Sequence, residues 1–222
     1  MSARHASAAG FSLVEVSIVL MVVAILTAVA APSASRTLDR ARVVRAVGDA
    51  EAIKTAMINF GDDLNSYQGF NIDGSSSSGD QVEMAVSDGD TPIEVSFDGD
   101  ERWICPVAVV PDPGCDVTDF LENHLILNNP YGGSNVDAYP LAGGNTWRGA
   151  YLNGPVDPDP WGNRYAVNVR YLQAPSETKN DVIVLSAGPD EQIDTQYEKD
   201  GIFPGDDDII VVINRHKGTP VP

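Results

Sequence analysis

Cysteine, histidine and positive charge are all scarce in this sequence of 222 residues. It has two cysteines and three histidines, too few for a zinc ribbon, an iron–sulfur cluster or a dense disulfide framework. Lysine and arginine number 14 against 32 aspartates and glutamates, giving a formal net charge of −18. Such an acidic surface repels phosphate backbones and argues against nucleic-acid binding. Neither a P-loop nor a dinucleotide-binding fingerprint is present, so the sequence predicts no enzymatic activity and no catalytic residue.

Long apolar runs are also rare, and the notable one covers residues 11–31, where Glu15 is the only charge. A helix of this length rises about 30 Å, close to the thickness of the hydrocarbon core of a bilayer. The run therefore predicts a membrane-spanning helix. A secretory signal peptide cleaved near Ala28–Ala31 is the alternative. The carboxylate inside the run counts against it, because acids within a membrane are costly and are functional candidates by default.

The residues at the start of this run are Gly10-Phe11-Ser12-Leu13-Val14-Glu15. They resemble the leader junction of type IV pilins and pseudopilins. The resemblance implies that residues 1–10 are a leader cleaved after Gly10 by a prepilin peptidase, that Phe11 becomes the methylated N-terminus, and that Glu15 acts in assembly. A carboxylate in an apolar filament core is tolerable when an ammonium group pairs with it. Glu15 is therefore expected to pair with the Phe11 amine of a neighbouring subunit. The alternative is a Glu15 carboxylate that snorkels to the membrane face.

The expected N-terminal helix covers residues 11–60, and Pro32 is expected to end or kink its apolar part. Residues 32–60 predict an amphipathic half whose apolar stripe should pack on a globular head. The members of this stripe are spaced mostly by threes: Leu38, Ala41, Val44, Val47, Ile53, Met57 and Phe60.

Residues 61–145 predict a variable, loop-rich insertion with many acidic and glycine-containing turns. Short strands are expected at Gln81–Val86 and Thr91–Phe97. Cys105 and Cys115 enclose nine residues, and we expect them to form a disulfide if the head lies in an oxidising compartment. On the chain-entropy model, closing so small a loop stabilises the fold by about 2–3 kcal/mol.

The segment 146–222 carries a second set of motifs. Trp147-Arg148-Gly149-Ala150-Tyr151-Leu152, followed by Pro155–Tyr165, resembles the W-x-G-x-Y-L…P-x-D-P-W-G-x-x-Y signature of the major pseudopilin of the type II secretion system. One additional Asp-Pro precedes Trp161. Strands are expected at 165–171, 181–185 and 209–213. The expected fold class is therefore α+β, with a long N-terminal helix packed on a C-terminal antiparallel β-sheet head, as in pilins.

Two acidic segments follow, Ser186–Asp190 and Gly205–Ile209. They resemble the S-x-G-x-D-G…D-D-D-I calcium loop of the same pseudopilins. The resemblance implies a Ca²⁺ site formed by the Ala187 carbonyl and four carboxylates: Asp190, Asp206, Asp207 and Asp208. Calcium takes about six to eight oxygen ligands, and successive aspartates repel one another unless a cation or solvent offsets their charge. The chain departs from the pattern because Glu191 replaces a glycine and the loop is longer. A solvated acidic loop is the alternative.

These resemblances imply a structural subunit of a type II secretion pseudopilus. Such a subunit crosses the inner membrane once, with its head in the periplasm, although four arginines between positions 36 and 45 oppose that orientation by the positive-inside rule. It would form a homopolymer with minor pseudopilins, using a prepilin peptidase and an inner-membrane assembly platform, and help export folded proteins through an outer-membrane secretin. One alternative is a type IV pilin or minor pilin of a surface filament for adhesion or motility. Another is a secreted calcium-binding adhesive domain behind an ordinary signal peptide.

Overall fold

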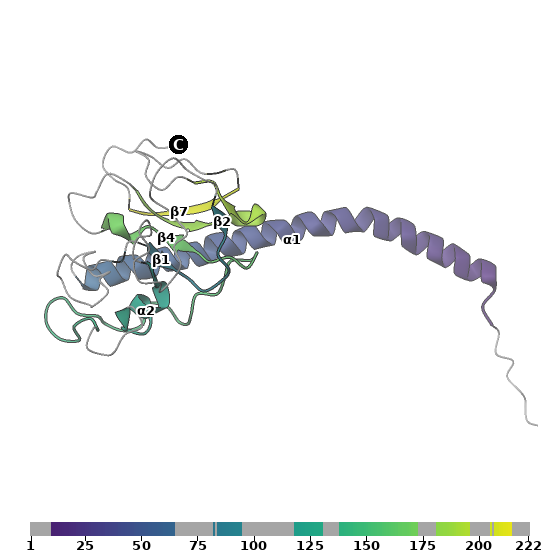
Figure 1. Ribbon diagram of the computed structural model, residues 1–222. Coiled ribbons are helices and arrows are strands. Elements are labelled where there is room, and N and C mark those ends of the chain that lie inside the picture. Colours follow the sequence, from purple (N-terminus) through teal and green to yellow (C-terminus); the bar gives the residue numbers. More distant parts are fainter. Residues whose placement is uncertain are drawn as a thin grey trace, which may run out of the picture. The chain divides into compact units, whose positions relative to one another are not determined.

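The computed structural model describes residues 10–64, 82, 84–94, 118–130, 138–172, 181–195, 205 and 207–214 (Figure 1). The chain divides into two compact units, Met1–Ala41 and Arg42–Pro222. The long helix α1 covers Leu13–Asp63. The remaining helical elements are α2 (Leu121–Leu125), η4 (Val169–Leu172) and η5 (Gly188–Asp190). The strands are β1 (Met84–Val86), β2 (Ile93–Glu94), β3 (Thr118–Phe120), β4 (Ala166–Val167), β5 (Val182–Ser186), β6 (Gln192–Ile193) and β7 (Ile209–Asn214).

Pro32 was expected to end or kink the apolar helix; α1 continues through position 32, so the helix does not end there, and the kink stays a prediction. A proline inside a helix lacks the N–H for one backbone hydrogen bond, and its ring crowds the preceding turn. The helix is nevertheless continuous from Leu13 to Asp63, so the proline is accommodated within it.

The first unit consists of the apolar part of α1 and the residues before it. Its large apolar side chains from Phe11 to Val29 are exposed. Among the described residues, α1 is the helix that is long and apolar enough to cross a membrane, by length and composition. This agrees with the membrane-spanning helix expected from the sequence.

The second unit contains a five-stranded sheet with the order β3-β1-β4-β5-β7. Its pairs are antiparallel except β1 with β3, which run parallel. The predicted strands at 181–185 and 209–213 are confirmed as β5 and β7. The strand expected at 165–171 is only two residues long, because the chain turns into the 3₁₀-helix η4 after Asn168. A separate pair joins β2 to β6 in parallel.

The predicted insertion 61–145 supplies β1 and β3 to this sheet. We expected short strands in Gln81–Val86 and Thr91–Phe97, and both hold one, β1 and β2. Strand β3 and helix α2 were not predicted. Residues 95–117, including Cys105 and Cys115, lie outside the described residues, and so does Asp206. Part of the insertion is thus an integral layer of the head.

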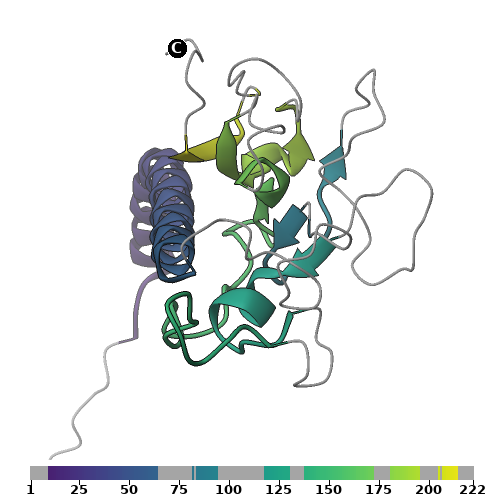
Figure 2. The same cartoon turned by 90° about the vertical axis from the view of Figure 1, so that its left-hand side faces the viewer.

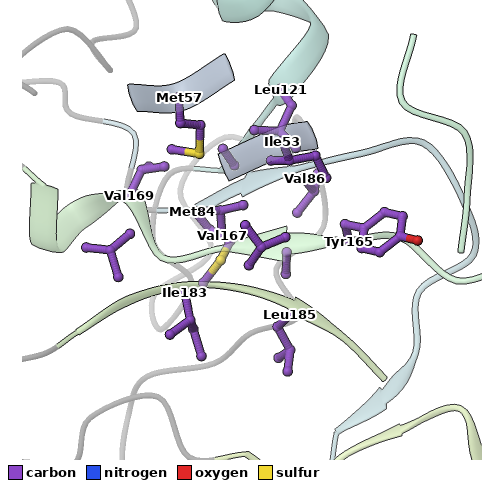
Figure 3. Close-up of a cluster of buried hydrophobic side chains, with 14 of the residues drawn as sticks. Ile53, Met57, Met84, Val86, Leu121, Tyr165, Val167, Val169, Ile183 and Leu185 are labelled. Carbon is purple, nitrogen blue, oxygen red and sulfur yellow. The ribbon is translucent and has the colours of Figure 1, made fainter. Parts of the chain in front are cut away.

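The core of the second unit lies between the last turns of α1 and the sheet. Figure 3 shows Ile53 and Met57 of the helix facing Met84 and Val167 of the strands. Strand β5 is buried along all five residues. In Figure 3 its Ile183 and Leu185 point away from the helix, so both faces of the strand are covered. Figure 2 shows the part of α1 that belongs to the second unit, residues 42–63, beside the sheet.

The predicted stripe is confirmed at Ile53, Met57 and Phe60, which are buried, and is wrong at its earlier positions, where the buried residues are Ala46 and Ala50. Ala46 and Ala50 are fully buried, whereas Val44 is 71% exposed and Leu38 is 64% exposed. A stripe spaced by threes rotates around a helix of 3.6 residues per turn, while alternating steps of four and three stay on one face. The buried residues take those alternating steps: Ala46, Ala50, Ile53, Met57 and Phe60. The small alanines allow the sheet unit to approach the helix closely.

Candidate functional site

The leader junction lies at the start of α1, where Gly10 and Phe11 precede the helix and are exposed. The Ser12 hydroxyl oxygen accepts a hydrogen bond from the Glu15 backbone N–H at 3.2 Å. Ser12 and Glu15 therefore have the spacing and one of the two bonds of a helix capping box. An acidic residue in the first turn also interacts favourably with the helix dipole. This capping arrangement was overlooked in the sequence, although the S-x-x-E spacing indicates it. The residues before Gly10 lie outside the described chain, so cleavage and methylation stay predictions.

The W-x-G-x-Y-L segment connects the end of α1 to α2. The Trp147 indole N–H donates to the His124 carbonyl at 3.0 Å, and the Tyr151 backbone N–H donates to the Leu125 carbonyl at 2.8 Å. The Tyr151 hydroxyl donates to Asp63 Oδ2, also at 3.0 Å. Burial raises the pKa of the Tyr151 phenol, so it stays a hydrogen-bond donor at neutral pH. The tryptophan and tyrosine of the motif thus join two helices.

The D-P-W-G segment is a tight turn organised by Asp159. One carboxylate oxygen, Oδ1, accepts from the backbone N–H groups of Trp161 at 3.0 Å and Asn163 at 2.9 Å. The Gly162 N–H donates back to the Asp159 carbonyl at 2.9 Å, and Gly162 has a φ of +102°. A positive φ of this size favours glycine because it has no Cβ. The motif therefore encodes one turn, in which the aspartate accepts the hydrogen bonds and the glycine adopts the positive φ.

The structure identifies which of the two Asp-Pro pairs carries this motif. Asp159 is 4% exposed, whereas the Asp157 side chain is 80% exposed. The contact recorded for Asp157 is a long ion pair, 3.9 Å from Arg45. The additional pair noted in the sequence is therefore Asp157-Pro158, and Asp159 is the motif aspartate.

The turn also joins three strand ends of the sheet. The second carboxylate oxygen of Asp159 accepts from the Ser186 hydroxyl at 2.6 Å, at the end of β5. After the turn, Tyr165 exchanges two bonds with Ser87 at the end of β1, at 2.8 and 3.0 Å. Ser186 in turn accepts from the Gly188 N–H at 3.3 Å. The motif therefore fixes the point from which the aspartate loop departs.

The aspartate loop brings together two of the predicted calcium ligands, Asp190 and Asp207. The Asp190 backbone N–H donates to Asp207 Oδ2 at 3.0 Å. Burial, together with the nearby charge of Asp190, raises the pKa of the Asp207 carboxyl. The backbones are also close, because a Cβ on Gly188 would lie 2.3 Å from the Asp207 carbonyl oxygen. Ala187 precedes this glycine and is fully buried. Two carboxylates and a nearby backbone turn are suitable oxygen donors for Ca²⁺.

The third described aspartate, Asp208, turns toward another partner. Its Oδ2 accepts from the backbone N–H groups of Asp194 at 3.1 Å and Thr195 at 2.7 Å, and from the Thr195 hydroxyl at 2.5 Å. Within the described residues Oδ1 is buried without a hydrogen bond. No group of three histidine, cysteine or acidic residues in the described part of the chain is arranged to hold a metal. The fourth predicted carboxylate, Asp206, falls outside that part.

The residue after Asp190 shows why the family pattern has glycine there. Glu191 has a φ of +62°, in the left-handed region. A residue with a Cβ is disfavoured in this conformation by roughly 1–2 kcal/mol. The loop therefore keeps the left-handed backbone conformation that the glycine of the pattern implies, although Glu191 is less suited to it than glycine.

A buried polar cluster was overlooked in the sequence. His124 is fully buried, with Nε2 at 2.8 Å from Asp119 Oδ2 and Nδ1 at 2.5 Å from the Tyr139 hydroxyl. Asp119 Oδ1 also accepts from the Phe120 N–H and the Asn123 side chain, at 2.7 and 2.6 Å. The three histidines lie far apart in the sequence, so no spacing indicated this cluster. Because Asp119, His124 and Tyr139 are buried and His124 contacts both of the others, the cluster links β3 and α2 within the head.

A comparison with protein families gives a match over residues 135–203 to the family described as type II secretion system (T2SS), protein G. This segment is therefore similar to that family. The match supports recognition of the chain as a pseudopilin of the type IV pilin superfamily. The matched segment contains Trp147, Asp159 and the loop from Ser186 to Asp190, and it ends before Gly205. No match was found among curated proteins or among solved structures.

The family is one of structural secretion-system pseudopilins and not of enzymes. It implies assembly into a pseudopilus with other components of the secretion system. Together with the apolar helix at the N-terminus, the match fits a membrane-anchored protein.

Proposed function

We propose that this pseudopilin polymerises in the periplasm into a type II secretion pseudopilus that helps to export folded proteins through an outer-membrane secretin. The observation that carries the proposal is that the signature side chains of the family-matched segment are buried and hydrogen-bonded within the head. Asp159 and Ser186 of this segment are both buried and hydrogen-bonded to each other, which is a structural role. They hold together a head whose helix α1 carries an exposed apolar segment.

The exposed apolar segment of α1 must be shielded from water by a membrane or by other protein. Exposed apolar surface of this extent marks contact with a membrane or with other protein. In the proposal it lies in the inner membrane before assembly and against neighbouring helices afterwards. Cleavage after Gly10 gives Phe11 a new ammonium group, which methylation leaves cationic. The carboxylate of Glu15 in a neighbouring subunit then pairs with it, because an unpaired charge in an apolar core is costly.

The pairing role of Glu15 is separable from its place at the start of the helix. Ser12 accepts from the backbone N–H of Glu15, so Glu15→Ala keeps this bond. We expect Glu15→Ala to be cleaved normally and to form few filaments, measured as the pelletable fraction after mild cross-linking. Ser12→Ala is the matched control, because it removes the capping bond and keeps the carboxylate. Filament yield at the wild-type level in Glu15→Ala would reject the pairing.

We also propose that the aspartate loop binds Ca²⁺ through the Ala187 carbonyl and four carboxylates: Asp190, Asp206, Asp207 and Asp208. The like charges of Asp190 and Asp207 support this, because their proximity is unfavourable until a cation offsets it. Bound calcium would supply charge neutralisation and a cross-link between the loop segments. The full chain in detergent should therefore unfold at a higher temperature in calcium than in EGTA. Equal unfolding midpoints in calcium and in EGTA would reject calcium binding and favour the alternative of a solvated acidic loop.

Deleting the gene tests the secretion role itself. We expect exported proteins to accumulate in the periplasm and to disappear from the medium, while surface filaments remain unchanged. A plasmid copy of the wild-type gene should restore the proteins in the medium. Loss of surface filaments, with the exported proteins present in the medium at their normal level, would instead indicate a type IV pilin.

A further inference from the structure

Four exposed arginines follow the apolar part of α1: Arg36, Arg40, Arg42 and Arg45. By the positive-inside rule they oppose the orientation that the family implies. Arg45 has a partner in the head, because its Nε lies 3.4 Å from Asp49 Oδ2. Within the described residues, Arg36, Arg40 and Arg42 take part in no ion pair. Their guanidinium groups are therefore available to another molecule.

Arg36 and Arg40, but not Arg42, belong to the same compact unit as the apolar segment, Met1–Ala41. They are four residues apart in a continuous helix, so they lie on one face of it. Like charges at this spacing repel each other modestly. An anion that contacts both guanidinium groups offsets this repulsion. The planar guanidinium group binds phosphate through two parallel hydrogen bonds, so the pair is well suited to a phosphate group.

The position of this arginine pair along α1 brings it to the surface of a membrane that the apolar run spans. A rise of about 1.5 Å per residue places Arg36 about 7.5 Å and Arg40 about 13.5 Å beyond position 31, where the run ends. The headgroup layer on one side of a bilayer is about 5–8 Å thick. Side chains on a helix tilt toward its N-terminus, which here is the direction of the membrane. Both guanidinium groups therefore reach the level of the lipid phosphates.

We propose that Arg36 and Arg40 bind the phosphate groups of anionic phospholipids while the subunit is held in the membrane. The inference rests on the proposed function for this membrane stage, and it adds the lipid chemistry that the stage requires. The rest of the chain would repel an anionic bilayer, since residues 46–222 hold nine lysines and arginines against 30 aspartates and glutamates. The arginine pair opposes that repulsion at the point where the chain leaves the membrane.

Acidic residues of a second copy of the chain are the competing partner. Lipid is favoured because the pair shares a compact unit with the apolar segment. Insertion of that segment alone brings the pair to the headgroups, without any assembly step. Lipid binding is therefore a property of the single subunit, whereas pairing with a second copy occurs only in filaments.

The test reconstitutes the full-length chain in phosphatidylcholine vesicles with trace spin-labelled phosphatidylglycerol or spin-labelled phosphatidylcholine. Electron spin resonance measures how much of each labelled lipid the protein immobilises, and the ratio gives the lipid preference. The wild-type chain should prefer phosphatidylglycerol by about two- to fivefold at low salt. The preference should approach one in about 0.5 M NaCl, because salt screens exposed charges.

The double variant Arg36→Gln/Arg40→Gln should have a ratio near one at low salt. Glutamine is a good helix former, so the exposed face of α1 should stay helical. Arg45→Gln/Arg148→Gln is the matched control, since it also removes two cations. Those two are ion-paired within the head, with Asp49 and Asp63, so this variant should keep the wild-type preference.

The other outcomes separate this inference from the proposed function. Immobilised lipid with a wild-type ratio of one would overturn the inference and leave the membrane stage intact. No immobilised lipid with either probe would reject the membrane-spanning helix, and both would fail. A wild-type preference retained by Arg36→Gln/Arg40→Gln would place the lipid site elsewhere. A ratio of one in every protein, with filaments lost only in Arg36→Gln/Arg40→Gln, would show that the pair meets acidic residues of a second copy.

Discussion

Replacing Asp159 by alanine should destabilise the head far more than replacing its neighbour Asp157. Asp159 is 4% exposed and accepts from two backbone N–H groups and from the Ser186 hydroxyl. Leaving a buried donor without its acceptor costs about 1–3 kcal/mol. Water entering the space left by the carboxylate recovers part of this, so we expect a total loss of about 3 kcal/mol.

Asp157→Ala is the matched control, since it removes the same side chain two residues earlier. Its exposed ion pair with Arg45, at 3.9 Å, should contribute less than about 0.5 kcal/mol. Thermal unfolding of the full chain in detergent measures both. The expected fall in midpoint is about 6–12 °C for Asp159→Ala and under about 2 °C for Asp157→Ala. Equal effects of the two substitutions would refute the assignment of Asp159 as the organiser of the turn.

Three further substitutions test other parts of the head. Glu191→Gly relieves the left-handed conformation at φ +62° and should raise the midpoint by about 2–4 °C; a lower midpoint would contradict the strain. Asp119→Ala leaves the fully buried His124 without its carboxylate partner and should cost about 1–3 kcal/mol in urea unfolding; a loss below about 0.5 kcal/mol would exclude a structural role. Burial raises the folded-state pKa of Asp207 above 3.8. The folded chain then binds more protons than the unfolded chain in the window just above that value, so in EGTA its stability falls as the pH rises through the window. Asp207→Asn should remove this fall, and an identical pH profile for the two proteins would contradict it.

The elements with strong local signals were predictable from the sequence. The apolar run and its continuation gave α1, because length and composition alone determine such a helix. Strands β5 and β7 were predictable from their runs of β-branched and aliphatic residues. The first part of the buried face of α1 was not, because Ala46 and Ala50 carry little hydrophobic signal and yet are fully buried.

The other contacts that hold the head together join residues that are far apart in sequence. Strand β3 is three residues long and pairs in parallel with β1, so no local period marks it. Asp119 and Tyr139 meet at His124 only through the tertiary fold. The motif around Asp159 was visible as a pattern, but its role as a turn joining β4 to β5 follows from the hydrogen bonds. The pattern also gave no means to separate Asp207 from Asp208, which differ in which segment they contact.

The central claim is that this chain acts as a pseudopilin, by assembling into a filament. The most direct test is the distribution of an exported protein between periplasm and medium in cells whose only copy of the gene carries Glu15→Ala. The account predicts that the pseudopilin is cleaved and present at its normal level while the exported protein stays in the periplasm. Full export under the same conditions, with no filament formed, would contradict it.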